Sequence, residues 1–299
     1  MPIKIFLTGA SGLLGGNLLR LLTERRDVQL CAVQRRDFVI ASAFSHGHET
    51  LTLDLSSETA LWNVLSYFQP DVIIHTAAMT DPTACEWQRE EATLHNIAVT
   101  RTLTNLAEHF RARLIFISTD LVFDGQKGNY IETDARHPLS FYGETKVISE
   151  DYIMQMLEDY AILRTTIMLG YSPRGTRSLN ERLMLEIANG RIPTLFSDEY
   201  RSPISVETLA HIILEFALDD ARSLNGVFHA VGNERLSRCE LGTKIFNHFS
   251  VPSTCYRCAP LESVASLPPR PRDCSLNNQK LRAVIKTRIP PIDEVIGSL

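Results

Sequence analysis

A tyrosine and a lysine, Tyr142 and Lys146, stand four residues apart in a segment with the pattern of a helix. Residues at this spacing share one helix face, so the phenol and the ammonium group are expected to be neighbours. A neighbouring ammonium group favours the phenolate and lowers the phenol pKa, so Tyr142 could exchange a proton near neutral pH. The pair predicts a proton-transfer site, although this spacing alone is common by chance.

Polar side chains at the end of a strand strengthen that prediction. The strand expected over residues 113–118 is followed directly by Thr119 and Asp120. Ligands of open α/β sheets bind beyond the carboxyl ends of the strands, so Thr119 is placed to hydrogen-bond a substrate carbonyl. Asn96, on the helix expected over residues 90–110, is a candidate to anchor a water molecule beside Lys146.

A glycine-rich turn lies between a strand-like run at residues 4–7 and a helical pattern at residues 13–23. Its three glycines allow a tight turn, close approach of a pyrophosphate and close packing of helix on strand. The helix N-terminus adds unpaired N–H groups and a positive dipole end. The predicted cofactor contacts in this turn are Gly9, Ser11, Gly12, Leu13, Leu14 and Gly15.

The end of the second strand bears on the choice between NAD and NADP. NAD-binding proteins commonly carry an acidic residue there, which binds the ribose hydroxyls. Here Gln34 is followed by Arg35 and Arg36, and guanidinium groups pair well with phosphate. The sequence therefore favours NADP, although Asp37 could turn inward and leave both arginines in solvent.

The elements that position these residues alternate along the first half of the chain. Strands are expected at 4–7, 28–33, 50–53, 72–75, 113–118 and 160–164, with helices at 13–23, 58–68, 90–110 and 141–158. This alternation predicts an α/β fold with a doubly wound, Rossmann-type parallel sheet. Residues 1–170 are assigned to the dinucleotide-binding domain, and residues 171–299 mainly to a smaller α/β substrate lobe, with late segments returning to the sheet.

Composition limits the other possibilities. The chain has 299 residues, a net charge of −5, and apolar and charged fractions of 44% and 22%, which are ordinary for a globular protein. The mild negative charge argues against nucleic-acid binding. No run suits a membrane span or a signal peptide, so a cytoplasmic location is expected. The six cysteines are expected to be reduced thiols, since only Cys255 and Cys258 have a paired spacing and no metal site is predicted.

The chain resembles the extended short-chain dehydrogenases/reductases, and within them the dTDP-4-dehydrorhamnose reductase family. The matching segments follow the family order along nearly the whole chain: residues 8–15, 75–80, 85–86, 118–125, 142–146, 163–165, 202–204, 270–271 and Leu276. The Ser-Thr-Asp-x-Val-Phe-Asp-Gly run at residues 118–125 is the most specific of them. The resemblance implies NADPH-dependent reduction of a keto group on a nucleotide-linked sugar.

The resemblance also implies roles for particular residues. Thr119, Tyr142 and Lys146 match the catalytic positions of the family, and Asp120 a position near the substrate. The segment against the cofactor includes Ala77 and Ala78, and the adenine side includes Asp54 and Leu55. Thr80 and Arg270 are implied substrate contacts, the latter for a pyrophosphate. The alternative for Asp54 is that it caps the following helix without contacting the cofactor. The alternative for Arg270 is that it lies in a surface loop without contacting the substrate.

The departures from the family pattern fall on the substrate side. Residues 167–169 replace a segment that often has tryptophan, and residues 81–83 replace a Val-Asp-type stretch. Arg201 stands where glycine is usual. The reaction type is therefore better supported than the substrate.

Two other functions remain open. One is a non-catalytic, NADP-binding regulatory subunit resembling the β subunit of methionine adenosyltransferase. The other is a nucleotide-sugar epimerase or dehydratase on the same scaffold. A homodimer through the helices at 90–110 and 141–158 is expected by analogy alone.

Overall fold

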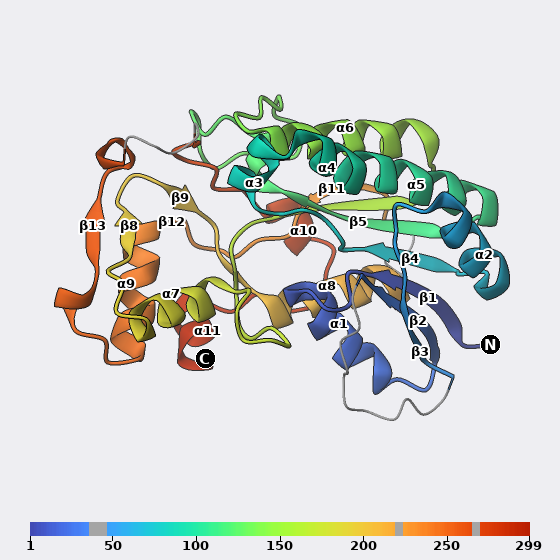
Figure 1. The fold of residues 1–299 in the computed structure, drawn as a ribbon, viewed down its shortest axis with the longest axis horizontal. Helices are drawn as coiled ribbons and strands as arrows, with labels where there is room; N and C mark the ends of the chain where they lie inside the picture. The colour runs from blue at the N-terminus through green and yellow to red at the C-terminus, as the bar shows by residue number, and fades with distance from the viewer. Residues whose placement is uncertain (36–46, 219–223, 265–269) are drawn as a thin grey trace.

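The computed structural model of the chain describes residues 1–35, 47–218, 224–264 and 270–299. Its centre is a seven-stranded sheet of order β11-β6-β5-β4-β1-β2-β3 in which all neighbours run parallel (Figure 1). The strands are β1 Ile3–Thr8, β2 Val28–Gln34, β3 Glu49–Thr52, β4 Val72–His75, β5 Arg113–Thr119, β6 Tyr160–Thr165 and β11 Gly226–His229. The doubly wound α/β prediction is confirmed.

The strand order reverses at β1. The chain passes from β1 to β2 and β3 on one side, and then returns to place β4, β5 and β6 on the other. Such a reversal leaves a crevice at the carboxyl ends of β1 and β4, because the connections on either side lead away from it. The residues after β1, β4 and β5 are therefore brought to one edge of the sheet.

Helices cover both faces of the sheet, because strands that are apolar on both sides must be buried on both. Figure 1 shows α1 and α8 on one face, and α4, α5 and α6 on the other. The helices of this part are α1 Leu13–Thr23, α2 Glu58–Phe68, α3 Pro82–Trp87, α4 Arg89–Ala92, α5 Val99–Phe110, α6 Phe141–Met156, α8 Val206–Leu218 and α10 Gln279–Arg282. Each face therefore has its own hydrophobic core. The core under α1 and α8 includes Leu18 and Ile212, and the core under α5 and α6 includes Leu103 and Ile153.

The helix expected over residues 90–110 differs from a uniform α-helix. A π-helical segment, Thr93–Ala98, separates α4 from α5. Single π turns inside α-helices are frequent at functional sites, because they shift the hydrogen-bonding register of the residues within them. Asn96 lies in this segment.

A smaller lobe lies at one end of the sheet, on the left in Figure 1. Its elements are β7 Met168–Leu169, α7 Leu179–Ala188, β8 Thr194–Phe196, β9 Tyr200–Arg201, β10 Ile204–Ser205, β12 Leu236–Ser237, α9 Arg238–His248, β13 Arg257–Ala259 and α11 Ile292–Gly297. Leu183, Leu241 and Phe246 belong to its own hydrophobic core. The division at residue 170 stays a prediction; α8 and β11, later in the chain, lie against the main sheet.

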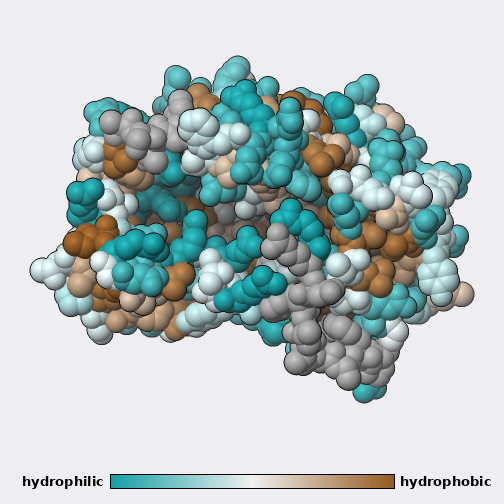
Figure 2. All heavy atoms as spheres, in the orientation of Figure 1, coloured by the Kyte–Doolittle hydropathy of each residue, from teal (hydrophilic) through white to brown (hydrophobic). Residues whose placement is uncertain are grey.

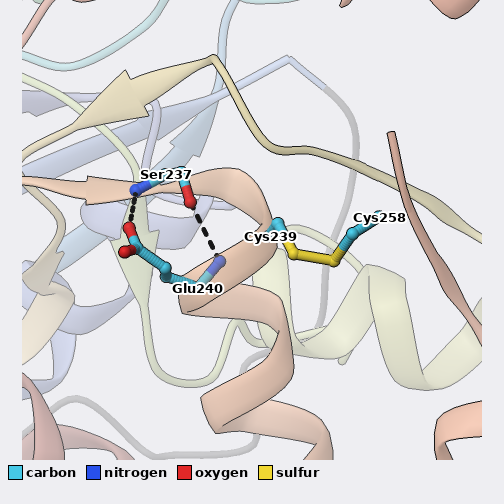
Figure 3. The surroundings of a disulfide bond; sticks show 4 residues. All are labelled: Ser237, Cys239, Glu240 and Cys258. Carbon is cyan, nitrogen blue, oxygen red and sulfur yellow. Dashed lines mark hydrogen bonds between the residues drawn. A yellow bond between two sulfur atoms is a disulfide. The ribbon is translucent and has the colours of Figure 1, made fainter. Parts of the chain in front are cut away.

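The lobe contains a disulfide between Cys239 of α9 and Cys258 of β13, with Cα atoms 5.5 Å apart (Figure 3). The expectation of six reduced thiols is therefore wrong for these two residues. Their separation of 19 residues gives no paired spacing. They meet because β13 pairs with β8 while α9 packs closely on the same strand, where a Cβ on Gly242 would overlap the Leu195 side chain.

Among the described residues, no helix is both long enough and apolar enough to cross a membrane.

Candidate functional site

The glycine turn after β1 has the geometry that a dinucleotide pyrophosphate requires. Gly9 has a φ of +74°, and its carbonyl oxygen accepts the Gly12 N–H at 2.9 Å. A Cβ on Gly15 would overlap that same carbonyl oxygen, so only glycine lets α1 start this close to β1. Among the described residues, no side chain caps the N-terminus of α1, so its first N–H groups are available to an anion.

The other predicted contacts in this turn differ in what they offer. Leu14 is buried in the core, and Leu13 is partly buried against it. These two side chains serve packing, so only their backbone N–H groups are suited to phosphate. Ser11 is half-buried and carries the one hydroxyl of the turn's predicted contacts. The residues present therefore fit a dinucleotide.

The segment after β4 is fastened to this turn. Thr8 Oγ1 accepts hydrogen bonds from the N–H groups of Thr76 and Ala77, both at 3.2 Å. A Cβ on Gly9 would lie 2.7 Å from Thr76 Oγ1, so the two segments are in direct contact at the switch point. Ala77 and Ala78 are half-buried there, as a cofactor-facing segment requires. Thr80 lies just beyond and is exposed.

The residues predicted at the adenosine end lie beyond β2 and β3. Arg35 is exposed directly after β2, and its charge contributes to lowering the pKa of Asp54. The larger causes of that lowering are hydrogen bonds from the Ser56 N–H at 3.0 Å and hydroxyl at 2.7 Å. Asp54 therefore caps a turn before α2, while Leu55 beside it is half-buried. Arg36 lies outside the described residues.

Thr119 and Tyr142 are brought together at the carboxyl end of β5. Both are nearly buried, with 6% and 7% of their surface exposed. The Thr119 hydroxyl forms a hydrogen bond that lowers the Tyr142 pKa, and it also accepts the Leu121 N–H at 3.2 Å. Gly143 makes this approach possible, because a Cβ there would overlap the Leu121 carbonyl oxygen. The sequence reading gave Gly143 no role.

The electrostatics of the tyrosine–lysine pair differ from the sequence expectation. Burial, with the Asp120 and Cys85 charges, raises the Tyr142 pKa above its usual range, so the phenol holds its proton. Burial also lowers the pKa of Lys146 to about 7. Lys146 Nζ donates to the Ile117 carbonyl at 2.8 Å. Burial is the largest cause of the shift in the Tyr142 pKa, so desolvation outweighs the effect expected from the lysine charge.

Asn96 braces the backbone near the site. Its Oδ1 accepts the Met79 N–H at 2.8 Å, and its Nδ2 donates to the Met79 carbonyl and to Thr145 Oγ1, both at 3.1 Å. The Asn96 carbonyl accepts the hydroxyls of Thr100 and Ser149 at 2.6 and 2.9 Å. Asn96 therefore joins the segment after β4 to helix α6, while the expectation that it anchors a water molecule stays a prediction.

Asp120 is fully engaged by neighbouring side chains. Its Oδ1 accepts the Thr119 hydroxyl at 3.1 Å, and its Oδ2 accepts Thr166 Oγ1 at 2.6 Å and lies 3.2 Å from Arg201 Nε. Burial raises the Asp120 pKa, while the Arg201 charge opposes the rise. The arginine that departs from the family pattern thus neutralises the acid at the end of β5.

Arg201 and Arg270 both approach Glu199, a buried residue that sequence reasoning missed. Arg201 Nη2 lies 3.2 Å from Glu199 Oε1, and Arg270 Nη1 lies 3.7 Å from Oε2. Arg270 itself is exposed. No spacing in the sequence links Arg270 to Glu199, because β9 and the segment at 270–272 meet only in the fold.

A second buried carboxylate, Glu150, holds helix α6 in place. Glu150 on α6 accepts hydrogen bonds from Ser118 Oγ at 2.6 Å and from Arg164 Nε and Nη2 at 3.0 and 2.7 Å. Arg136 adds a contact at 3.0 Å. The network ties α6 to β5 and β6, which gives Arg164 of the 163–165 motif a physical role.

Comparisons with known proteins agree with this geometry. The family model "RmlD substrate binding domain" matches residues 3–298. The chain is similar to methionine adenosyltransferase 2 subunit beta of Xenopus laevis, with 30% identity over 93% of this chain and 81% of that protein.

Two solved structures share the fold. One is a hypothetical dTDP-4-dehydrorhamnose reductase from Sulfolobus tokodaii, with TM-score 0.81, 32% identity and coverage of 98% of this chain and 99% of that chain. The other is the dTDP-4-dehydrorhamnose reductase of Bacillus anthracis in complex with NADP, with TM-score 0.85, 23% identity and coverage of 100% and 98%. The chain belongs to the RmlD substrate-binding domain family, within the extended short-chain dehydrogenases/reductases, a class of NAD(P)-dependent oxidoreductases.

Proposed function

We propose that this chain is an NADPH-dependent reductase of a keto group on a nucleotide-linked sugar. The observation that carries the proposal is a protonated phenol, Tyr142, which is hydrogen-bonded to Thr119 where β5 ends and packs against Met79 of the segment after β4. The likeness to dTDP-4-dehydrorhamnose reductases supports this substrate class.

The residues of the chain have distinct parts in the proposed reaction. NADPH, when bound, supplies the hydride. Tyr142 donates its proton to the developing alkoxide, and the Thr119 hydroxyl, once it turns away from Asp120, donates a hydrogen bond to the same oxygen. Lys146 is only partly charged near neutral pH, since burial lowers its pKa to about 7, and its charge favours release of the phenolic proton.

The preference for NADP over NAD is part of the proposal. Arg35 is exposed after β2, where it is available to pair with a 2′-phosphate, and Arg36 follows it in the sequence. Asp54 is occupied by Ser56, which leaves it less suited to binding the ribose hydroxyls.

The decisive experiment follows NADPH oxidation with a panel of 4-keto nucleotide sugars. Tyr142→Phe should abolish turnover, because the proton donor is removed, while the Kd for NADPH, measured by fluorescence titration, stays within about twofold of wild type, since the phenol is not needed for phosphate binding. Full activity of Tyr142→Phe would overturn the assignment.

A second candidate is a non-catalytic NADP-binding subunit. It is favoured by the 30% identity to methionine adenosyltransferase 2 subunit beta. Such a protein would bind NADPH, would show no turnover with any sugar, and would co-purify with a methionine adenosyltransferase catalytic chain. An epimerase or dehydratase would instead retain its cofactor through purification. A homodimer through α5 and α6 stays a proposal, tested by sedimentation.

A further inference from the structure

Residues 194–201 of the substrate lobe lie between two elements from later in the chain. The segment contains β8, a turn and β9, and it carries Glu199 and Arg201. On one side, β13 pairs with β8. On the other side, β12 pairs with β9 and leads directly into α9, whose first N–H group donates to the Glu199 carbonyl at 2.8 Å. We call β13 and the β12–α9 unit the two flanking elements, and the position of β9 depends on both.

The disulfide joins the two flanking elements to each other. Cys239 lies in the first turn of α9, and Cys258 is the middle residue of β13 (Figure 3). Cys258 is opposite Leu195 in the register of β13 and β8. The segment that carries Glu199 and Arg201 is therefore enclosed by elements that a covalent bond keeps together.

Arg201 connects this arrangement to the catalytic side. Its Nε lies 3.2 Å from Asp120 Oδ2, and Asp120 Oδ1 accepts the Thr119 hydroxyl at 3.1 Å. Thr119 is in turn hydrogen-bonded to Tyr142. Since β9 is only two residues long, a shift of this strand would carry the Arg201 side chain with it. A chain of contacts thus leads from the disulfide to the residues around the proposed proton donor.

The bond has the surroundings of a reducible disulfide. Cys258 is exposed and Cys239 is half-buried, so a thiol reagent can reach the bond. Attack on the Cys258 sulfur would release the Cys239 thiolate at the N-terminus of α9, where the helix dipole stabilises negative charge. The acid of this turn, Glu240, accepts the Ser237 N–H at 2.7 Å (Figure 3). A leaving thiolate that is stabilised in this way accelerates reduction and favours the reduced form.

The lobe has other sources of stability besides this bond. Leu183, Leu241 and Phe246 belong to its own hydrophobic core, and β13 keeps its pairing with β8. A capping box formed by Ser237 and Glu240 fixes the start of α9. Loss of a cross-link between residues 19 apart should therefore leave both flanking elements folded but no longer fastened to each other.

We propose that the Cys239–Cys258 bond is a redox switch that controls the substrate side of the site through the position of Arg201. When the bond is formed, β9 is fixed and Arg201 neutralises Asp120. When the bond is reduced, α9 and β13 can separate, and β9 with Arg201 moves more freely. The effect on turnover rests on the proposed function, whereas the loosening of β9 does not.

The chemical step is thiol–disulfide exchange with a small dithiol. One thiolate of the dithiol attacks Cys258 Sγ, and the bond to Cys239 breaks as Cys239 leaves with the electron pair and takes up a proton. The second thiol of the dithiol then attacks its own mixed-disulfide sulfur and displaces Cys258 in the same way. The dithiol ends as a cyclic disulfide, and its two electrons and two protons reside on the two cysteines. A disulfide of the same chemical class reverses the step.

The test compares backbone hydrogen exchange in the oxidised protein and in protein kept reduced with dithiothreitol. The N–H groups of Ser197, Tyr200 and Arg238 report on the enclosed segment, because they donate to the carbonyls of Ala259, Arg272 and Glu199 at 2.9, 2.6 and 2.8 Å. Reduction should speed their exchange about 10-fold or more, because local opening of β9 becomes easier once the cross-link is gone. The N–H groups of β5 should keep their rates.

Two cysteine variants complete the test. Cys258→Ser should exchange as the reduced wild type does, both with and without dithiothreitol. The matched control is Cys255→Ser, which changes a free thiol in the same part of the chain and should keep the full response to the reductant. If Cys258→Ser fails to fold, Cys239→Ser takes its place. Equal exchange in the oxidised and reduced wild type, or faster exchange that includes β5, would overturn the switch.

Kinetics separate the switch from the proposed function. With 4-keto nucleotide sugars, reduction should raise the KM for the sugar about threefold or more, while the Kd for NADPH stays within about twofold. Faster exchange of the segment with unchanged sugar kinetics would overturn the control of the site. Exchange that responds to reduction, with no sugar turnover in either form, would refute the proposed function and leave the loosening of β9 standing. Sugar turnover with unchanged exchange and unchanged KM would refute the switch alone.

Discussion

The cofactor side and the substrate side of the cleft are built by different means. The cofactor side is made of backbone and small residues: Gly9, Gly15 and Ala77 meet where the strand order reverses. The substrate side is made of charged side chains from segments far apart in the sequence, such as Asp120, Arg201 and Arg270. A phosphate-binding turn can be formed by one contiguous stretch, whereas a charge network needs the completed fold.

The largest effect is expected from removing a buried charge on the substrate side, the guanidinium group of Arg201. Arg201→Met removes a cation that contacts both Asp120 and Glu199, so two buried carboxylates lose their partner. The free energy of unfolding should fall by about 3–5 kcal/mol, as measured by urea titration. Arg20→Met is the control, because Arg20 pairs with Glu207 on the surface, where the loss should stay below about 1 kcal/mol. Equal losses in the two variants would contradict the view that the substrate side depends on its buried ions.

The disulfide gives a second test on the same side. Cys258→Ser should cost about 3 kcal/mol of unfolding free energy, because the bond closes a loop between residues 19 apart. A reductant should bring the wild type to the level of the variant. Cys255→Ser, which changes a free thiol nearby, should have little effect on unfolding. A wild type that unfolds identically with and without reductant would show that the bond does not stabilise the lobe.

On the cofactor side, the corresponding test adds a single methyl group to the glycine turn by the substitution Gly15→Ala. Gly15→Ala places a Cβ against the Gly9 carbonyl oxygen, so α1 must move away from the turn. Because overpacking of this kind typically costs 1–3 kcal/mol, NADPH affinity in a fluorescence titration should fall about 10- to 100-fold. Gly297→Ala, where nothing lies within 4 Å of the new Cβ, should bind NADPH normally. Unchanged affinity in Gly15→Ala would mean that the turn does not hold the cofactor.

The contrast also explains what the sequence predicted. The strand–glycine–helix pattern around Gly9 and the alternating elements depend on local residues, so a doubly wound parallel sheet could be predicted from them, although the order of its strands was not. Thr119 and Tyr142 come together in the structure because they flank consecutive elements at one edge of the sheet, whereas their catalytic roles stay predictions.

The parts that escaped prediction depend on distant partners or on burial. Arg201 stood out as a departure, but its contact with Asp120 required β9 to fold back onto the end of β5. The Cys239–Cys258 bond required α9 and β13 to meet across β8. The direction of the Tyr142 pKa was wrong because spacing reports which groups are neighbours, whereas the degree of burial decides which effect is larger.

The smallest expected effect concerns Lys146, a buried charge on helix α6 whose pKa differs between the folded and the unfolded chain. Its pKa is about 7 in the folded chain and 10.5 for an ordinary lysine, so between these values the unfolded chain binds more protons. The unfolding free energy should therefore rise with pH above 7, by at most about 1.4 kcal/mol per pH unit from this group. Lys146→Met should remove that part of the rise in urea titrations between pH 7 and 9, while Lys127→Met, on the surface, should keep it. If the unfolding free energy of Lys146→Met still rises with pH in the same way, Lys146 is charged throughout this range in the wild type. An anion or solvent would then reach the lysine, and the proton donor Tyr142 would be exposed to a full positive charge.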